Sequence, residues 1–261
     1  MNIIVCIKQV PDAKDIQWTE NNTMKREGVE SVINPCDLYA IEAALKCKKI
    51  KPDTVITAIT MGPQQAEKIL RQAIALGCDE AYLICDKRFS GADTLATGKT
   101  LASAIRKISP NYDLIFCGQF ASDGDTAQTG VEIAENLNAY QITYATKIID
   151  FEYDFIKAEQ ETECNTQEVK TPLPCVICTT EHQYTTLSDA LISGQIKAQD
   201  AQIKTLTLED LDIDVQNVGI KGSPTYVSNV FRPIHNRKGE IINPDEAVEF
   251  CKSLVNGVMQ E

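Results

Sequence analysis

This sequence of 261 residues contains little histidine and little positive charge. Its histidines are His182 and His235, and 25 Lys and Arg stand against 37 Asp and Glu, which gives a formal net charge of −12. The scarcity of histidine excludes a histidine-rich metal site and leaves no obvious general base. The acidic balance argues against binding to a nucleic-acid backbone, which requires clustered Lys and Arg, and to anionic membrane surfaces.

Long apolar runs are also missing. The run at the start, in MNIIVCIKQVPD, spans about six apolar residues, which is too short for the apolar core of a secretory signal. No stretch approaches the roughly 20 apolar residues that a membrane-spanning helix requires. We therefore expect a cytoplasmic protein without membrane insertion.

Catalytic constellations are absent as well. Nothing resembles a Ser–His–Asp triad, and no Ser or Cys lies in a nucleophile elbow. This absence is typical of a protein that holds a cofactor and leaves the chemistry to it.

Cysteine, in contrast, is plentiful, and several cysteines lie within apolar runs, where a free thiol packs as a small apolar group. Cys175 and Cys178 form a C-x-x-C in PCVICTT. Positions three apart on a strand point to opposite faces, so we expect packing here and no metal site. The ten cysteines are Cys6, Cys36, Cys47, Cys78, Cys85, Cys117, Cys164, Cys175, Cys178 and Cys251.

Strand and helix patterns alternate over the first two-thirds of the chain. Apolar runs that end in Gly, Pro or Asp predict buried parallel strands, and residues at helical spacing follow each of them. This alternation predicts an α/β domain with a doubly wound, mostly parallel, Rossmann-like sheet. The later strands include antiparallel ones, and residues 12–33 leave room for a short hairpin. The predicted strands are 2–10, 54–61, 81–86, 113–118, 142–151, 155–160 and 174–180, and the predicted helices begin near 34–37, 64, 90 and 126.

The composition changes near residue 190. Residues 191–261 are polar with weak periodicity, apart from a short helix pattern in NPDEAVEFCKSLVNGV. Such a segment buries too little apolar surface to form a core of its own. We therefore divide the chain into an α/β domain, 1–190, and an extended C-terminal arm, 191–261, that is either flexible or wraps a partner.

The loop 118–130, GQFASDGDTAQTG, is the strongest candidate for a ligand site, because ligands of doubly wound sheets bind at the carboxyl ends of the strands. Asp125 or Thr126 could cap the helix that follows, and the free N–H groups at its start would face a phosphate. Gln128 and Thr129 offer further donors. The alternative is a helix that is capped after an ordinary turn and binds nothing.

Two other strand–helix junctions are weaker candidates. In 60–65, TMGPQQ, Gly62 follows a strand, and the alternative is a simple turn with Pro63 at the first helical position. In 91–100, GADTLATGKT, threonines occupy the first helical turns, where they are poor helix formers. Their hydroxyls either point at a ligand or bond back to helix carbonyls.

Taken in order, several segments resemble the β subunit of electron-transferring flavoproteins over residues 1–190. The matching segments are 8–12 (KQVPD), 34–37 (NPCD), 60–63 (TMGP), 73–79 (AIALGCD) and the loop 118–130. The resemblance implies an adenine nucleotide at the strand ends and a C-terminal arm that packs on an α subunit. The positions that match the family's cofactor site are Cys6, Asn34, Pro35, Cys36, Asp37, Met61, Gly62, Thr94, Thr97, Ala121, Ser122, Asp123, Gly124, Asp125, Thr126, Ala127, Gln128, Thr129 and Gly130.

Within this family the nucleotide is either a structural AMP or, in electron-bifurcating members, a second FAD. The sequence DGDTAQ at 123–128 and the block GADTLAT at 91–97 resemble the bifurcating form. The resemblance therefore implies an FAD that accepts hydride from NADH and, with the α subunit, divides the electrons between ferredoxin or flavodoxin and a dehydrogenase. The alternative is an ordinary β subunit that holds AMP.

The segment 181–187, EHQYTTL, matches the family's partner-recognition loop, with Leu187 as the residue that docks on an acyl-CoA or similar flavin-containing dehydrogenase. His182 and Gln183 depart from the Pro-Arg of many members, which indicates either an unusual partner or drift in a surface loop. A remote alternative for the whole chain is a regulatory module that senses ATP, although that function leaves the C-terminal arm unexplained.

Overall fold

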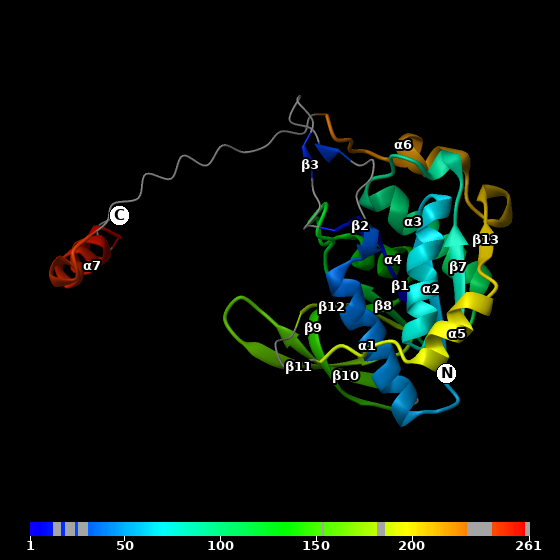
Figure 1. The fold of residues 1–261 in the computed structure, drawn as a ribbon, viewed down its shortest axis with the longest axis horizontal. Helices are drawn as coiled ribbons and strands as arrows, with labels where there is room; N and C mark the ends of the chain where they lie inside the picture. Colours follow the sequence, from blue (N-terminus) through cyan, green and yellow to red (C-terminus); the bar gives the residue numbers. More distant parts are fainter. Residues whose placement is uncertain are drawn as a thin grey trace.

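The computed structural model describes residues 1–12, 17–18, 24–25, 31–152, 154–181, 186–228 and 242–258. A nine-stranded sheet forms its centre, with the strand order β11-β10-β9-β12-β8-β1-β6-β7-β13 (Figure 1). The strands are β1 (Asn2–Cys6), β6 (Val55–Met61), β7 (Glu80–Ile84), β8 (Leu114–Gly118), β9 (Tyr140–Phe151), β10 (Phe155–Glu161), β11 (Thr166–Pro172), β12 (Cys175–Thr179) and β13 (Lys204–Leu206).

Seven adjacent strands of this sheet, from β9 to β13 in the order above, pair in parallel. β10 is antiparallel to both of its neighbours, β9 and β11. These pairings confirm the predicted mostly parallel sheet with an antiparallel part. β11 and β13 were not predicted, because the first is almost entirely polar and the second is very short.

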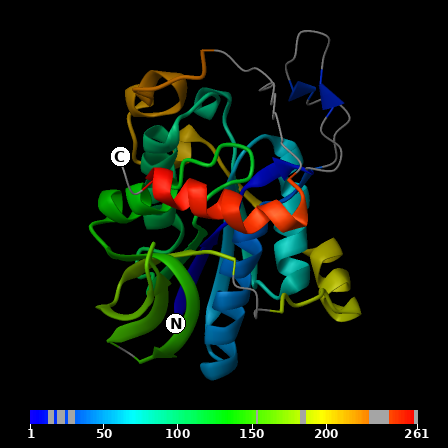
Figure 2. The same ribbon diagram turned by 90° about the vertical axis from the view of Figure 1, so that its left-hand side faces the viewer.

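Helices cover both faces of the sheet. α1 (Pro35–Ile50) and α2 (Glu67–Leu76) share one buried cluster with Leu114 and Phe116 of β8, whereas α3 (Thr94–Ile108) and α4 (Thr129–Leu137) share the other with Ile115 and Cys117. Figure 2 shows α1, in blue, and α4, in green, on either side of the sheet. The fold is therefore doubly wound, as predicted.

The two faces also separate the cysteines of the C-x-x-C. Cys175 belongs to the cluster beneath α1 and α2, and Cys178 to the cluster beneath α3 and α4. The expected packing role is confirmed, and no group of three or more His, Cys, Asp or Glu side chains among the described residues could hold a metal ion.

The predicted strand 2–10 is divided in two. β1 ends at Cys6, and β2 (Gln9–Pro11) leaves the main sheet to pair antiparallel with β5 (Ser31–Ile33). β3 (Gln17–Trp18) and β4 (Met24–Lys25) form a second small antiparallel pair, in agreement with the predicted hairpin. The break falls at Lys8, whose backbone N–H and carbonyl bond to Asp37 and Asn34 instead of to a strand.

The first part of the C-terminal segment packs on the α/β domain. α5 (Ile192–Asp200) lies against α2, and β13 adds an edge strand to β7. The short helices η4 (Leu208–Asp210), η5 (Val215–Asn217) and α6 (Gly219–Gly222) follow, and Leu208 and Val218 are buried in the cluster beneath α3 and α4. Figure 1 shows α7 (Pro244–Val258), in red, away from the sheet. Packing of the arm on a second subunit stays a prediction. Among the described helices, none has the length and apolar character needed to cross a membrane.

Candidate functional site

The carboxyl ends of β1 and β8 form the topological switch point of the sheet. These strands are parallel neighbours, yet the chain leaves β1 for α1 on one face and leaves β8 for α4 on the other. Loops that diverge in this way open a crevice in which doubly wound folds bind their ligands. The predicted segment 34–37, on the β1 side, and the predicted loop 118–130, on the β8 side, meet at this switch point.

Asp37, in the first turn of α1, joins the two sides. Its Oδ2 accepts a hydrogen bond from the Lys8 N–H at 2.6 Å, and its Oδ1 accepts from the Gly118 N–H at 3.1 Å. The Asn34 side-chain amide donates to the same Oδ1 at 3.0 Å. Burial raises the pKa of Asp37 to about 7, and these donors oppose the rise without cancelling it. Asp37 therefore links the end of β1, the first turn of α1 and the end of β8 from a buried position.

Asn34 holds the loop after β8 from the same position. Its Nδ2 donates to the Phe120 carbonyl at 2.9 Å, and its Oδ1 accepts from the Ser122 N–H at 3.0 Å. Since Asn34 is buried, both bonds are shielded from water. The Asn-Pro-Cys-Asp segment thus fixes the loop through its first and last residues, and Pro35 begins α1 between them.

Gly118 allows this close contact. A Cβ at this position would lie 2.1 Å from Asp37 Oδ1 and 2.9 Å from the Cys36 carbonyl carbon. Cys36 itself is buried, and burial raises the pKa of its thiol. The glycine is therefore required by packing between β8 and α1, independently of any ligand.

The loop between Phe120 and α4 has an unusual backbone. Asp125 and Ala127 adopt positive φ angles of 51° and 55°, and the Gly124 and Asp125 N–H groups donate to the Ala121 carbonyl at 3.2 and 2.8 Å. α4 begins at Thr129, and its N-cap residue, Gln128, forms no side-chain cap. The predicted helix start at 126 and the caps by Asp125 or Thr126 are therefore wrong, because the left-handed residues delay the helix. Within the part of the chain that the structure describes, no N-cap side chain occupies the first N–H groups of α4, so these groups can bind an external acceptor.

Two further residues complete the support of this loop and were missed in the sequence. Gln119 is buried, with its Oε1 accepting from the Tyr144 N–H at 2.7 Å and its backbone N–H donating to the Thr179 carbonyl at 2.7 Å. Lys8 follows the end of β1, and its Nζ lies 2.6 Å from Asp123 Oδ1. Their position directly after buried strands is the sequence signal that could have identified them.

A polar cluster connects α3 to α4. Thr94 Oγ1 lies 3.2 Å from Gln128 Oε1 and 3.1 Å from Glu132 Oε1. Gly98 brings the helices together, since a Cβ there would approach Glu132 Cβ to 2.8 Å. Burial raises the pKa of Glu132, and its Oε2 is buried without a hydrogen-bond partner in the described part of the chain. The structure thus brings the predicted Thr94 and Gln128 together and adds Glu132.

The other residues at the start of α3 have structural roles. Asp93 caps the helix by accepting from the Ala96 N–H at 3.0 Å, and its Oδ2 accepts from the Thr225 N–H at 3.0 Å. Thr100 bonds back to the Ala96 carbonyl, which is one of the roles expected for these threonines. Thr97, predicted to contact the cofactor, lies half-buried one turn after Asp93.

Three cysteines form a row beneath the loop. Cys6, Cys117 and Cys178 are register partners on β1, β8 and β12, and all three are buried. A Cβ on Gly130 would lie 2.3 Å from Cys178 Sγ, so the glycine lets α4 start directly above this row. Burial raises the pKa of the Cys178 thiol, and all three cysteines pack in the cluster under the candidate site.

Three predicted residues lie outside the hydrogen-bond network around Asn34 and Asp37. Met61 ends β6 next to β1, and the N–H of the following Gly62 donates to the Ile84 carbonyl at 3.1 Å. Leu187 is half-buried, and the following Ser188 N–H donates to Glu42 Oε2 at 3.2 Å. His182 and Gln183, on which the departure from the family loop rests, lie outside the described residues.

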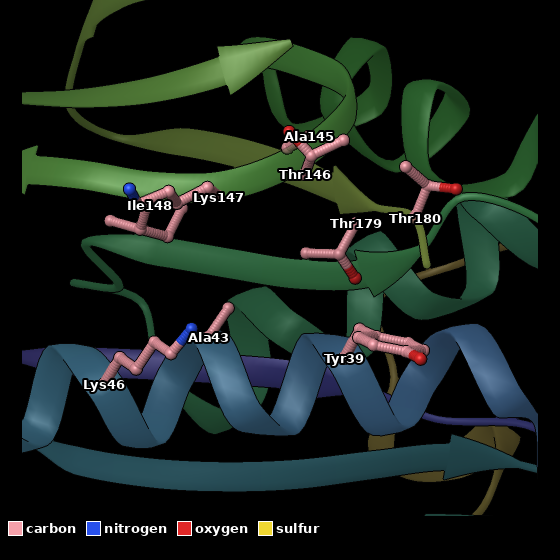
Figure 3. Close-up of a pocket in the computed structure, with 9 residues that line it drawn as sticks. All are labelled: Tyr39, Ala43, Lys46, Ala145, Thr146, Lys147, Ile148, Thr179 and Thr180. Atoms are coloured by element: carbon pink, nitrogen blue, oxygen red, sulfur yellow. The ribbon is translucent and has the colours of Figure 1, made fainter. Parts of the chain in front are cut away.

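A separate small pocket opens between α1, β9 and the end of β12 (Figure 3). Its volume of about 20 Å³ accommodates little more than a water molecule. The pocket does not include the loop 118–130, so it is not the candidate nucleotide site. The residues that line it are Tyr39, Ala43, Lys46, Ala145, Thr146, Lys147, Ile148, Thr179 and Thr180.

Residues 21–211 match the family described as the electron transfer flavoprotein domain. The chain belongs to the electron transfer flavoprotein family. Membership confirms the resemblance found in the sequence and assigns the chain to flavin-related electron transfer. The ATP-sensing alternative is thereby displaced.

Curated relatives place the chain on the β-subunit side of this family. It is 44% identical to an electron transfer flavoprotein subunit β of Thermoanaerobacterium thermosaccharolyticum, with 98% of each chain covered. It is 38% identical to the caffeyl-CoA reductase-Etf complex subunit CarD of Acetobacterium woodii, covering 100% of this chain and 99% of CarD. It is also 43% identical to the protein FixA of Bradyrhizobium diazoefficiens, over 89% of this chain and 83% of FixA.

Proposed function

We propose that this β-type subunit pairs with an electron transfer flavoprotein α subunit and binds FAD in the crevice between β1 and β8. Together the two subunits accept hydride from NADH. The electrons then divide between a low-potential acceptor, a ferredoxin or flavodoxin, and a flavin-containing acyl-CoA or similar dehydrogenase. The name of CarD, which assigns it to a complex with a reductase, supports the last of these partners.

The contact between α3 and the loop after β8 is the observation that carries the choice of FAD. AMP ends at one phosphate, which the uncapped N–H groups at the start of α4 could hold alone. FAD adds a second phosphate, a ribityl chain and a ring system, and these require more polar partners. Thr94 and Gln128 offer such partners on the α3 side of the loop, as does Glu132 Oε2, which has no hydrogen-bond partner among the described residues.

Each part of the site has a role in this proposal. The α4 amides bind phosphate oxygens, and Asn34 and Asp37 keep the loop in the conformation that presents these amides. Glu132, whose pKa is raised by burial, holds a proton more readily than an exposed carboxyl and can then donate a hydrogen bond from Oε2. When bound, FAD supplies the hydride-accepting and single-electron chemistry.

A cofactor count tests the proposal directly. The chain is co-expressed with its α-type partner, and the purified heterodimer is denatured and its nucleotides are quantified by chromatography. We expect about two FAD and no AMP per heterodimer, because the α subunit contributes the other flavin. One FAD with one AMP would instead make this chain an ordinary β subunit with a structural nucleotide, and no nucleotide on this chain would refute the site.

We also propose that Leu187 docks on the dehydrogenase, since it is half-buried beside α1 at the end of the family's recognition loop. The substitution Leu187→Ala should slow electron delivery to the dehydrogenase and leave NADH oxidation by artificial acceptors intact. Equal losses in both assays would contradict a docking role.

A further inference from the structure

We infer that Lys8 is a phosphate-binding residue whose ammonium group exchanges the Asp123 carboxylate for a phosphate of the ligand when a nucleotide enters the crevice. This inference rests on the proposed nucleotide site. It adds a binding residue outside the set that the sequence predicted, and it gives the Lys8–Asp123 ion pair a function.

The backbone of Lys8 is fixed on both sides. Its N–H donates to Asp37 Oδ2 at 2.6 Å, and its carbonyl accepts from the Asn34 N–H at 2.9 Å. The main chain is thus held at the carboxyl end of β1, next to β8. Only the side chain is left to move, and half of its surface is exposed.

The side chain reaches the loop that precedes α4. Nζ lies 2.6 Å from Asp123 Oδ1, and the Asp123 side chain is 29% exposed. An ion pair that is this open to water is weak, because solvent screens it and two side chains must be ordered to form it. Its partner can therefore be exchanged at little cost.

The charge around the crevice favours such an exchange. Asp123 and Asp125 lie on the loop, and Glu132 lies in the first turn of α4. Lys8 is the cationic side chain that contacts this loop in the described part of the chain. A phosphate that enters without a cation would be repelled by these carboxylates. The pyrophosphate of FAD and the monoester phosphate of AMP each carry about two negative charges, against one on the Asp123 carboxylate, and would compete with it for the ammonium group.

A purely structural ion pair would behave differently from this exchange. If the pair served only to latch the loop to β1, removal of either partner would open the site, and both changes would weaken binding. If Lys8 binds phosphate, the two changes have opposite effects. Loss of Lys8 removes the cation, whereas loss of the Asp123 charge removes its competitor and one repulsive group.

The experiment uses the heterodimer stripped of bound nucleotide and titrated by calorimetry with AMP, ADP or adenosine. AMP is the main probe because both candidate ligands contain it. We expect Lys8→Gln to weaken AMP binding about ten- to hundredfold, as for the loss of a hydrogen bond to a charged group, and to leave adenosine binding within about twofold. Lys8→Arg should retain most of the affinity, and Asp123→Asn should tighten AMP binding.

Lys147→Gln is the matched control, since it removes the same charge from an exposed position on β9. It should leave AMP binding unchanged. Equal weakening by Lys8→Gln and Asp123→Asn, or an equal loss of adenosine and AMP affinity in Lys8→Gln, would overturn the inference. Normal AMP binding by both the wild type and Lys8→Gln would overturn this inference alone, whereas no binding by the wild type would overturn the proposed site as well.

Discussion

The junctions after β8 and after β6 consist of the same parts but are held in different ways. Each has an apolar strand, a glycine and a helix, and the two flank β1 in the sheet. The loop after β8 is bonded to Lys8, Asn34 and Asp37. The turn after β6 bonds to its neighbouring strand through Gly62 and to itself through Pro63 and η2 (Gln64–Ala66).

This difference shows that the long-range polar contacts, and not the Gly-containing junction, distinguish a candidate site from a simple turn. In the β6 junction, the Ala66 N–H donates to the Pro63 carbonyl at 2.8 Å and Gln64 Nε2 donates to Glu67 Oε2 at 3.1 Å. Both contacts join residues that are close in sequence. The β8 loop, in contrast, takes its conformation from residues about eighty or more positions away, such as Asn34.

The largest expected difference between the two junctions comes from adding a methyl group at the glycine of each, Gly118 after β8 and Gly62 after β6. In Gly118→Ala the new Cβ would lie 2.1 Å from the buried Asp37 Oδ1, so we expect a loss of about 3 kcal/mol in the free energy of unfolding. In Gly62→Ala the nearest atom is Ala66 Cβ at 3.1 Å, which predicts a loss below about 1 kcal/mol. Urea unfolding of both variants measures the difference.

Gly124→Ala is the control within the β8 loop. A Cβ there meets no atom within 4 Å, and its φ is not positive, so its stability should equal that of the wild type. A similar loss for Gly118→Ala and Gly62→Ala would mean that the two junctions are held equally tightly.

A smaller effect is expected from Asn34→Ala. The change removes the bonds to Phe120 and Ser122, at a cost of about 1–2 kcal/mol, and should release the loop. We expect faster hydrogen exchange at 118–124 and a lower nucleotide content of the purified heterodimer. Gln64→Ala at the β6 junction removes a local bond and should change neither measurement. Full nucleotide content in Asn34→Ala would show that the loop does not need this support.

The sequence predicted where these junctions lie but not how they are held. Strand and helix positions follow from periodicity, and the apolar runs at 54–61 and 113–118 correspond closely to β6 and β8. The division of the strand 2–10 at Lys8 and the delayed start of α4 were not predicted. Both depend on tertiary hydrogen bonds or on left-handed residues such as Asp125, which local patterns do not encode.

The candidate site was likewise identified from the sequence only in part. The resemblance identified Asn34, Asp37 and Thr94, whose contacts the structure shows. It did not identify Gln119 or Glu132, because a polar residue after a strand and a Glu in a helix are common in any sequence. Only their burial and partners distinguish them.

The buried carboxylate should give the β8 loop a pH dependence that the β6 turn lacks. Burial raises the pKa of Asp37 to about 7, above its ordinary value of 3.8, so the folded state holds a proton that the unfolded chain releases between these values. The contribution of Asp37 to the free energy of unfolding should therefore be greatest at low pH and fall as pH rises from about 4 to 7. The slope contributed by the one group is at most about 1.4 kcal/mol per pH unit.

Asp37→Asn removes this titration. Unfolding of the wild type and the variant at pH 5, 6, 7 and 8 should show a flatter slope for the variant, although its stability is lower because an amide replaces one acceptor oxygen. Parallel slopes for the two proteins would indicate that Asp37 stays ionised throughout this range and that the surrounding donors outweigh its burial.

The smallest expected effect gives the most direct test of whether the ligand is FAD or AMP. Thr94→Val keeps the shape of the side chain and removes the hydroxyl that lies near Gln128 and Glu132, which should cost about 1 kcal/mol or less. Thr100→Val is the control, because its hydroxyl bonds only to its own helix at the Ala96 carbonyl. If α3 contacts the part of FAD that AMP lacks, Thr94→Val lowers FAD retention and leaves AMP affinity unchanged, whereas equal losses for both ligands would place Thr94 at the shared adenylate.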